Sequence, residues 1–352
     1  MVGSSSSSSL PRATLAVLAL ATAACSRGAG GDVGVSLITK NSSNPFFVAM
    51  QQGARREAQA RGVDLTIAAG KRDGDEETQV QAVENAIARG ERGILITPNG
   101  PGVNAALRKA REAGLYVIAL DTPTDPPEIV DITFATDNFK AGTLIGRWAR
   151  AQLGGRPATI ALLDLFADKI VSVDYERDQG FLTGMGIPTA DPKRNGDEAK
   201  SGEYEGGSYT IACNEPSLGA EDGGRTAMER CLARNAEINV VYTINEPTAL
   251  GAFKALQAAG RERGAVIVSV DGGCAGVNLV KQGIIGATAQ QYPLRMAALG
   301  VEAIVGIAKG GQKPRNSAGL SFFDTGVALV TDRPLAGLDS IASGQGLALC
   351  WG

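Results

Sequence analysis

Short apolar runs alternate with amphipathic segments along the chain from residue 33 onward. The strand-length runs, rich in Val, Ile and Leu, are residues 33–38, 63–69, 93–97 and 116–120. The segments with helical spacing, each ending near a glycine that can cap a helix, are residues 46–61, 76–89 and 103–113. Because the strand candidates show no polar alternation, we expect them to be buried on both faces. That pattern predicts a parallel sheet covered by helices on each side.

The same alternation returns in the second half of the chain. Its strand candidates are residues 158–165, 208–212, 240–244 and 266–270. Its helix candidates are residues 172–185, 224–234 and 248–259. A charged and glycine-rich stretch, residues 191–207, interrupts the rhythm and is expected to be a surface insertion. Two copies of one pattern predict an α/β protein with two similar lobes, each a doubly wound parallel sheet.

The last part of the chain is less regular. A helix is expected at residues 293–308, and a strand-like run covers residues 322–330. A chain that starts in one lobe, builds the second and then returns crosses between them several times, which makes a multi-strand hinge. The expected N-terminal lobe is residues 33–136 and 292–320, and the expected C-terminal lobe is residues 137–291 and 321–352.

The N-terminal segment differs in composition from the rest. A serine run and Arg12 precede an apolar stretch that is too short to span a bilayer but suits an export signal. The small residues before Cys25 resemble a bacterial lipobox, although Thr22 stands where leucine is usual. We therefore expect a signal peptide at residues 1–24, a lipidated Cys25 and a tether at residues 25–32, which together make the protein extracytoplasmic and membrane-anchored. An ordinary signal peptide cut nearby, or a buried helix, is the alternative.

Composition narrows the function. The chain has 34 Lys and Arg against 37 Asp and Glu, so it lacks the basic character that a nucleic-acid partner requires. It has no histidine, which excludes Ser-His-Asp triads, Cys-His dyads and His-ligated zinc. Neither a dinucleotide-binding nor a phosphate-loop glycine motif is present, so we expect no cofactor and no metal. We therefore do not expect an enzyme.

The cysteines other than Cys25 are consistent with an oxidising compartment. They are Cys213, Cys231, Cys274 and Cys350. Four thiols allow three pairings, and the sequence does not choose among them. Cys213 and Cys231 are near in sequence, which suits a local loop closure and would leave the other two to join the C-terminus to a loop. Free buried thiols are the rival interpretation.

Polar side chains follow several predicted strands, at the end where a ligand lies in open parallel sheets. Residues in these positions include Lys40, Asn44, Phe46, Phe47, Asp121, Asn245, Asp271, Gln290 and Gln291. Carboxylates accept hydrogen bonds and amides both accept and donate them, which suits a polyhydroxylated ligand such as a sugar. The paired phenylalanines suit the apolar face of a sugar ring. Because a single Asp or Asn at a strand end is more often a turn former, the recurrence in both lobes carries this hypothesis.

Several motifs together resemble the sugar-binding proteins of bacterial ABC importers, the type I periplasmic binding protein family that includes ribose-binding protein. The motifs are NPFF at 44–47, VIALD at 117–121, ATDN at 135–138, RDQGF at 177–181, SVDG at 269–272 and QQYP at 290–293. Within the family the chain is most similar to fructose-binding subunits. This likeness rests on TINEP at 243–247, VDGGC at 270–274 and the ending CWG at 350–352.

The resemblance implies a set of ligand-binding residues. They are Asn44, Phe46, Phe47, Asp121, Arg177, Asn245, Asp271 and Gln291. Further candidates are Lys40, Thr122, Asp137 and Gln290. Ribose-binding proteins carry arginine where Thr122 stands and a small hydroxyl residue where Lys40 stands, so fructose is favoured over ribose. The aromatic side chain that the second lobe usually adds is not visible, and Leu218 or Tyr204 is expected to replace it.

The resemblance also implies the function and the partners. The protein is expected to be a monomeric, extracytoplasmic solute-binding subunit that captures a monosaccharide, preferably fructose, between its lobes. It would deliver the sugar to an ABC permease and its ATPase, without a cofactor or a covalent step. A binding protein for ribose, xylose or inositol is one alternative. A sensor that presents its ligand to a chemoreceptor or a sensor kinase is another.

Overall fold

The computed structural model describes residues 1–5 and 33–352 of the chain. It divides into Met1–Asp32 and a compact unit, Val33–Gly352, which contains every element described below. Cys25, the expected tether and all but the first five residues of the expected signal peptide lie outside the described residues. Within the described part, no helix has both the length and the apolar character needed to cross a membrane.

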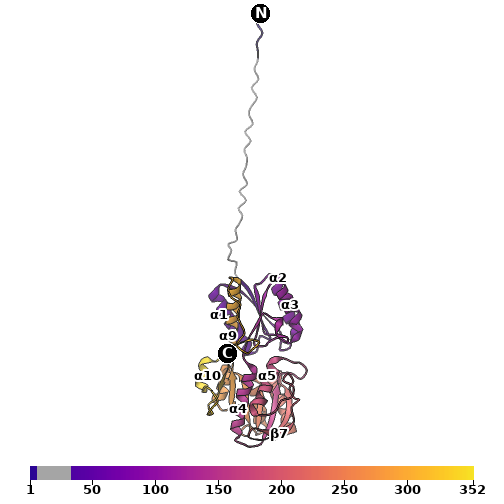
Figure 1. Cartoon of the computed structure of the whole chain (residues 1–352), viewed down its shortest axis with the longest axis vertical. Helices are drawn as coiled ribbons and strands as arrows, with labels where there is room; N and C mark the ends of the chain where they lie inside the picture. Colours follow the sequence, from indigo (N-terminus) through magenta and orange to yellow (C-terminus); the bar gives the residue numbers. More distant parts are fainter. Residues whose placement is uncertain (6–32) are drawn as a thin grey trace. The chain divides into compact units, whose positions relative to one another are not determined.

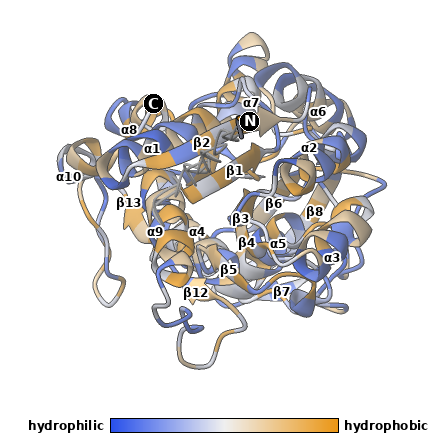
Figure 2. Ribbon diagram, turned by 90° about the horizontal axis from the view of Figure 1, so that it is seen from above, coloured by the Kyte–Doolittle hydropathy of each residue, from blue (hydrophilic) through white to orange (hydrophobic). Residues whose placement is uncertain are grey.

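The first lobe contains a six-stranded parallel sheet in the order β12-β5-β4-β3-β1-β2. The strands are β1 (Val33–Thr39), β2 (Val63–Ala69), β3 (Gly93–Ile96), β4 (Tyr116–Leu120), β5 (Ile132–Ala135) and β12 (Phe323–Asp324). Helices α1 (Pro45–Arg61) and α9 (Pro293–Ala308) pack on one face, and α2 (Glu76–Arg89) and α3 (Asn104–Glu112) pack on the other. In Figure 1, α9 lies beside α1 although the two are far apart in sequence. Figure 2 shows that α9 is largely hydrophobic in colour, whereas α1 and α2 are more hydrophilic.

The second lobe contains a seven-stranded sheet in the order β13-β11-β10-β9-β6-β8-β7, in which only the two edge strands run antiparallel to their neighbours. The strands are β6 (Ala158–Asp164), β7 (Ser201–Tyr204), β8 (Gly207–Pro216), β9 (Val240–Thr243), β10 (Val266–Asp271), β11 (Ala287–Gln290) and β13 (Ala328–Val330). Helices α4 (Asn138–Leu153) and α5 (Ser172–Met185) cover one face. Helices α6 (Glu221–Arg234), α7 (Glu246–Ala258), α8 (Cys274–Lys281) and α10 (Ser343–Leu349) lie on the other side. Two short 3-10 helices, η1 (Pro101–Val103) and η2 (Pro127–Ile129), belong to first-lobe loops.

The α/β class and the two doubly wound sheets are therefore confirmed, with one correction at the C-terminal end. The expected single strand at 322–330 is two strands, and β12 pairs with β5 in the first sheet while β13 pairs with β11 in the second. A turn at Gly326, whose φ is 92°, separates the two strands, and glycine adopts that left-handed conformation without strain. The segment 321–352 is thus not wholly part of the C-terminal lobe.

The chain passes from one lobe to the other between β5 and α4, between β11 and α9, and between β12 and β13. These three connections form the hinge. They lie at the carboxyl ends of β5, β11 and β12, so the ligand side of both sheets meets at the hinge.

Several elements escaped the sequence pattern. The structure adds β5, α4, β7, α8 and α10, which have no counterpart among the expected elements. The supposed surface insertion at 191–207 contains β7, which pairs antiparallel with β8, and Glu198 within it is buried. Helix α4 packs against α5 through small residues: a Cβ at Gly142 would collide with the backbone carbonyl oxygen of Arg177. Such a close helix contact needs glycine, because any larger side chain would separate the two helices.

Each of the two disulfides joins a cysteine to the next cysteine in sequence order. Cys213 pairs with Cys231 across β8 and α6, with Cα atoms 5.4 Å apart. Cys274 pairs with Cys350, with Cα atoms 4.9 Å apart, and so fastens the C-terminus beside the start of α8. This bond places Trp351 at the hinge, where its indole N–H donates a hydrogen bond to the carbonyl oxygen of Gln291 over 3.0 Å.

Candidate ligand-binding site

The loop after β1 brings two phenylalanines to the carboxyl edge of the first sheet. Asn44 caps α1, because its side-chain oxygen accepts a hydrogen bond from the backbone N–H of Phe46 at 2.9 Å. Phe46 and Phe47 meet edge to face with ring centroids 5.4 Å apart, and Phe46 also contacts the ring of Trp351 at 5.2 Å. Both phenylalanines are buried. The cap therefore fixes an aromatic surface that the C-terminal tryptophan supports from behind.

Asp121 occupies the end of β4 in a backbone conformation that is unusual for a residue other than glycine. Its φ is 65°, in the left-handed region, and strained backbone of this kind is concentrated at functional sites. Its carboxylate accepts a hydrogen bond from the Thr122 hydroxyl at 2.8 Å and lies 3.8 Å from the ammonium of Lys40. The first lobe thus presents a buried carboxylate and a buried cation together.

The second lobe presents a similar pair, built around Arg177 of α5. Its guanidinium donates to the side-chain oxygen of Asn138 at 2.8 Å and to the carbonyl oxygen of Ile244 at 2.9 Å. It also lies 3.8 Å from the carboxylate of Asp271, the last residue of β10. Because two partners in its own lobe hold the guanidinium, Arg177 is oriented before any ligand arrives.

Asp271 is itself held by a third residue. The amide of Gln291 donates to its carboxylate at 3.0 Å, and Gln291 is fully buried. The φ of Asp271 is 138°, again in the region that disfavours a side chain. Gln291 therefore lies behind Asp271 and supports it from the hinge.

Burial raises the pKa of two neighbouring carboxyl groups in the second lobe, Glu246 and Asp271. Burial, followed by repulsion from Asp271, raises the pKa of Glu246 to about 8. Burial also raises the pKa of Asp271 to about 7, although the guanidinium of Arg177 opposes the rise. Glu246 accepts hydrogen bonds from the backbone N–H groups of Gly272 and Gly273 and from the hydroxyl of Thr288. These bonds fix the loop after β10 and hence the position of Asp271.

Asn245 connects the end of β9 to α7. Its side-chain oxygen caps α7 by accepting from the backbone N–H of Thr248 at 3.1 Å, and its amide donates to the carbonyl oxygen of Gly219 at 2.9 Å. One amide hydrogen remains for a ligand. The turn-forming and ligand-facing roles of this asparagine are therefore compatible.

These groups converge on one small cavity to which both lobes contribute. Its lining is Lys40, Asn44, Phe46, Phe47, Asp73, Asp121, Leu165, Val173, Arg177, Ile244, Asn245 and Asp271. The cavity measures about 40 Å³, enough for only a few water molecules. A monosaccharide can therefore enter only if the lobes or the lining side chains move apart.

Gln291 and the remaining candidates lie outside this lining. Thr122 reaches the site through its bond to Asp121 and itself lines a neighbouring cavity of about 250 Å³. Asp137 caps α4 by accepting from the backbone N–H of Lys140 at 2.8 Å. Gln290 donates to the carbonyl oxygens of Gly272 and Gly346 and is fully buried. In this structure Asp137 is a helix cap, and Gln290 is a structural residue of the hinge.

Sequence reasoning missed part of the lining. Asp73 lies in the loop after β2, four residues beyond the strand, so a survey that covered the whole of each loop could have found it. The side-chain amide of Asn41 donates a hydrogen bond to the carboxylate of Asp73 at 3.0 Å. Burial raises the pKa of Asp73, while the ammonium of Lys40 opposes the rise. Leu165, Val173 and Ile244 are apolar and carry no signal in the sequence that distinguishes them from core residues.

The expected replacement for an aromatic side chain in the second lobe was wrong. Tyr204 lies in the core of that lobe, where its hydroxyl donates to the carbonyl oxygen of Arg156. Leu218 is exposed and is not part of the cavity lining. Leu165 and Val173 form the apolar wall on that side instead.

The fold and the two-lobed cavity together define the class of protein. The sequence matches the family described as periplasmic binding protein domain over residues 35–313, which is most of the chain, and the protein belongs to this family. The resemblance to the ribose-binding, type I branch of the family is confirmed.

Individual relatives agree with this assignment. The ribose import binding protein RbsB of Escherichia coli K12 is 26% identical over 277 residues, a match that covers 78% of this chain and 85% of the relative. The galactofuranose-binding protein YtfQ of the same organism is 27% identical over 267 residues, covering 73% and 77%. The crystal structure of an ABC transporter solute-binding protein from Agrobacterium vitis with bound D-fucose is 26% identical. It covers 88% of this chain and 100% of that one, with a TM-score of 0.71.

Proposed function

We propose that this protein is the solute-binding subunit of an ABC importer and that it captures one monosaccharide, preferably fructose, between its lobes. The observation that carries the proposal is the cavity in which each lobe supplies a buried carboxylate next to a buried cation. These are Asp121 with Lys40 and Asp271 with Arg177.

The chemistry of the lining matches a sugar. Carboxylates accept hydrogen bonds from hydroxyl groups, Lys and Arg donate to ring and hydroxyl oxygens, and asparagine does both. Phe46 and Phe47 offer an apolar surface for the C–H face of the ring. The relatives named above bind ribose, galactofuranose and fucose according to their names, so the choice of sugar rests on details of the lining. Lys40 and Thr122 differ from the ribose pattern, and the sequence likeness to fructose-binding subunits favours fructose.

Capture requires the two lobes to close on the ligand. A sugar that bridges Asp121 and Asp271 gains its full set of hydrogen bonds only in the closed arrangement, so it shifts the population of the protein toward that arrangement. The three connections at the hinge permit such a movement. The closed form would then dock on the permease, and no step in this sequence requires turnover of the sugar.

The proposal includes anchoring outside the cytoplasm. Cys25 with its upstream small residues supports lipidation, which would leave a monomeric binding protein tethered by the short segment that precedes Val33. Replacing Cys25 by serine should then release the protein from the membrane fraction of cells.

Isothermal titration against fructose, ribose, xylose, glucose, galactose and myo-inositol tests the proposal. We expect a one-to-one isotherm with fructose at a dissociation constant on the micromolar scale, about −8 kcal/mol. Asp271→Ala should weaken binding at least tenfold, whereas Asp137→Ala, which removes a carboxylate outside the lining, should not. Binding of another sugar instead of fructose would support the assignment as a sugar-binding subunit but overturn the preference for fructose. Silence across the whole panel, or equal effects of the two variants, would overturn the proposed site.

A further inference from the structure

A second cavity lies at the opposite edge of the first sheet, away from the sugar site. It measures about 530 Å³ and is lined by the start of β4, the last turns of α3 and α9, and the segment that follows α9. The backbone N–H of Tyr116 bonds to the carbonyl oxygen of Arg92, and the backbone N–H of Arg92 bonds to the carbonyl oxygen of Gly34. The cavity therefore adjoins the edge where the chain enters β1 at Val33.

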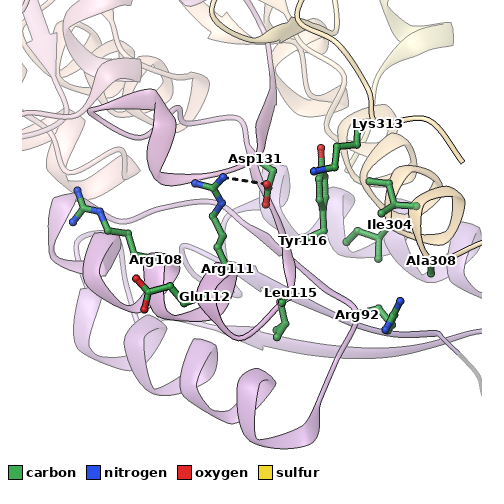
Figure 3. A pocket seen from close by; sticks show the side chains of 12 residues that line it. Arg92, Arg108, Arg111, Glu112, Leu115, Tyr116, Asp131, Ile304, Ala308 and Lys313 are labelled. Carbon is green, nitrogen blue, oxygen red and sulfur yellow. Dashed lines mark hydrogen bonds and ion pairs between the residues drawn. The ribbon is translucent and has the colours of Figure 1, made fainter. Parts of the chain in front are cut away.

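The cavity has an excess of positive charge. Its ionisable residues are Arg92, Arg108, Arg111, Glu112, Asp131 and Lys313, with Tyr116 beside them. Figure 3 shows Arg111 directed at Asp131, and the two are joined by an ion pair of 3.2 Å. Among the described residues, Arg92, Arg108 and Lys313 form no ion pair, and Glu112 is the one other carboxylate in the lining.

Apolar residues lie between these charges. Leu115, Ile304, Ile307 and Ala308 form part of the lining, and Figure 3 shows Ile304 and Ala308 on α9 opposite the arginines of α3. The ammonium of Lys313 lies 5.3 Å from the centroid of the Tyr116 ring. Burial raises the pKa of Tyr116 to about 12, so its hydroxyl stays protonated and can donate a hydrogen bond. A lining that combines cationic and apolar side chains suits an amphiphilic molecule with an anionic headgroup.

We propose that this cavity binds the headgroups of anionic phospholipids and so holds the N-terminal edge of the first lobe against the membrane. The inference rests on the proposed anchoring at Cys25. Seven residues lie between Cys25 and Val33, so eight Cα-to-Cα steps join them, and eight extended steps reach at most roughly 28 Å. A lipid on Cys25 therefore keeps this edge close to the bilayer, where Lys and Arg are attracted to anionic lipid by about 1 kcal/mol each.

Anchoring on this side leaves the sugar site free. The sugar cavity lies at the carboxyl ends of the strands, whereas the charged cavity lies beside their amino ends. A protein held by its charged cavity would thus keep the ligand side of both lobes directed away from the lipid that holds it.

Vesicle co-sedimentation tests the proposal on the chain from Val33 onward, which contains both sheets and both disulfides and needs no acylation. We expect binding to vesicles with one third phosphatidylglycerol in phosphatidylcholine, and none to pure phosphatidylcholine. The triple variant R92E/R108E/K313E should lower the partition coefficient at least tenfold, and the neutral variant R92Q/R108Q/K313Q should lower it by less. The matched control R147E/R263E/K281E reverses three exposed charges of the second lobe and should retain binding.

Two outcomes would overturn the proposal. One is the absence of wild-type binding to the anionic vesicles, and the other is an equal loss in the cavity variant and the control, which would indicate attraction without a site. Sugar titration of the same proteins reports separately on the proposed function and on folding. Sugar binding without lipid binding would contradict the proposed lipid site but not the proposed function. Lipid binding without sugar binding would contradict the proposed function but not the lipid site.

Discussion

The two lobes hold their carboxyl groups in different ways. In the first lobe, buried Asp121 and half-buried Asp73 both lie near Lys40, the one buried Lys or Arg in the described part of that lobe. In the second lobe, Arg177 is the only buried Lys or Arg among the described residues, yet this lobe contains many buried or half-buried carboxyl groups. Those with a raised pKa are Asp164, Asp174, Glu176, Asp178, Glu246 and Asp271.

This difference shows that similar sheets need not carry similar electrostatics. Burying a carboxylate without a cation costs free energy, and the group responds by keeping its proton. Burial thus raises the pKa of several carboxyl groups in the second lobe, whereas in the described part of the first lobe it raises that of Asp73. The dependence of stability and binding on pH and on charge removal should accordingly be concentrated in the second lobe.

Removal of Arg177 should have the largest effect. Arg177→Met would leave Asp271 without its cation and would free the carbonyl oxygen of Ile244 and the side chain of Asn138. Truncating one partner of a buried charge pair costs about 3 kcal/mol, so sugar affinity should fall roughly a hundredfold. Titration calorimetry measures this loss, and thermal unfolding of the variant shows whether the lobe remains folded. A loss of less than threefold would contradict the role assigned to Arg177.

Stability should fall as the pH rises through neutrality. Unfolded Asp and Glu titrate near their ordinary values, whereas folded Asp271 and Glu246 titrate at about 7 and about 8, so the folded protein binds more protons in between. As the pH rises from the ordinary pKa values of Asp and Glu to the folded pKa values of this pair, the free energy of unfolding therefore decreases. Above the folded pKa values it levels off. Between about pH 5.5 and about pH 8.5 we expect Tm to drop by roughly 5 °C.

The variant Glu246→Gln isolates the contribution of this pair. A neutral amide in place of Glu246 cannot ionise, so the slope of Tm against pH should become shallower. Differential scanning calorimetry of both proteins at the two pH values provides the comparison. Parallel slopes would show that the pH dependence arises from other groups.

Removal of Lys40 should have a smaller effect than removal of Arg177. The ammonium of Lys40 lies 3.8 Å from Asp121 and donates no hydrogen bond to a described partner in its own lobe, so it is less firmly oriented. Lys40→Met should weaken fructose binding by about tenfold, which corresponds to ~1.4 kcal/mol. The measurement is the same titration. If Lys40→Met were more damaging than Arg177→Met, the comparison between the lobes would be reversed.

The smallest effect on affinity should follow from loss of the C-terminal disulfide. The double variant C274S/C350S releases the segment that holds Trp351 against Phe46 and the hinge. We expect fructose affinity to fall by roughly threefold, about 0.6 kcal/mol, because the aromatic surface loses its support. The matched variant C213S/C231S opens a disulfide far from the cavity lining and should lower Tm without a change in affinity. Equal fructose affinities of the two double variants would show that Trp351 does not support the ligand site.

Much of the fold could be predicted because its elements are local. The bounds expected for the helices at 76–89, 172–185 and 293–308 agree with α2, α5 and α9. Their signals are local, since α2 and α5 end at a left-handed glycine and α9 is an apolar stretch that opens on a proline. Helix α4 was missed although Ala141, Ile145, Trp148 and Ala149 recur on its buried face at helical spacing, so its signal was present in the sequence.

The candidate site was predicted less completely. Asp121, Asn245 and Asp271 each follow a recognisable buried strand, and all three line the cavity. Gln290 and Asp137 occupy similar positions in the sequence but make hydrogen bonds within the hinge or at a helix end. A position at the end of a strand shows that a side chain can face a ligand, but the neighbouring loops decide whether it does.

The sequence by itself determined the α/β class, the two repeats of strands and helices, and the polar character of the strand ends, because these depend on residues that are near one another in the chain. Only the tertiary structure decided the pairing of the cysteines, the separation of β12 from β13, and the position of Trp351 behind Phe46. Each of these depends on contacts between distant segments. The ligand cavity belongs to the same group, because it forms only where the three crossings of the hinge bring Asp121 and Asp271 to one place.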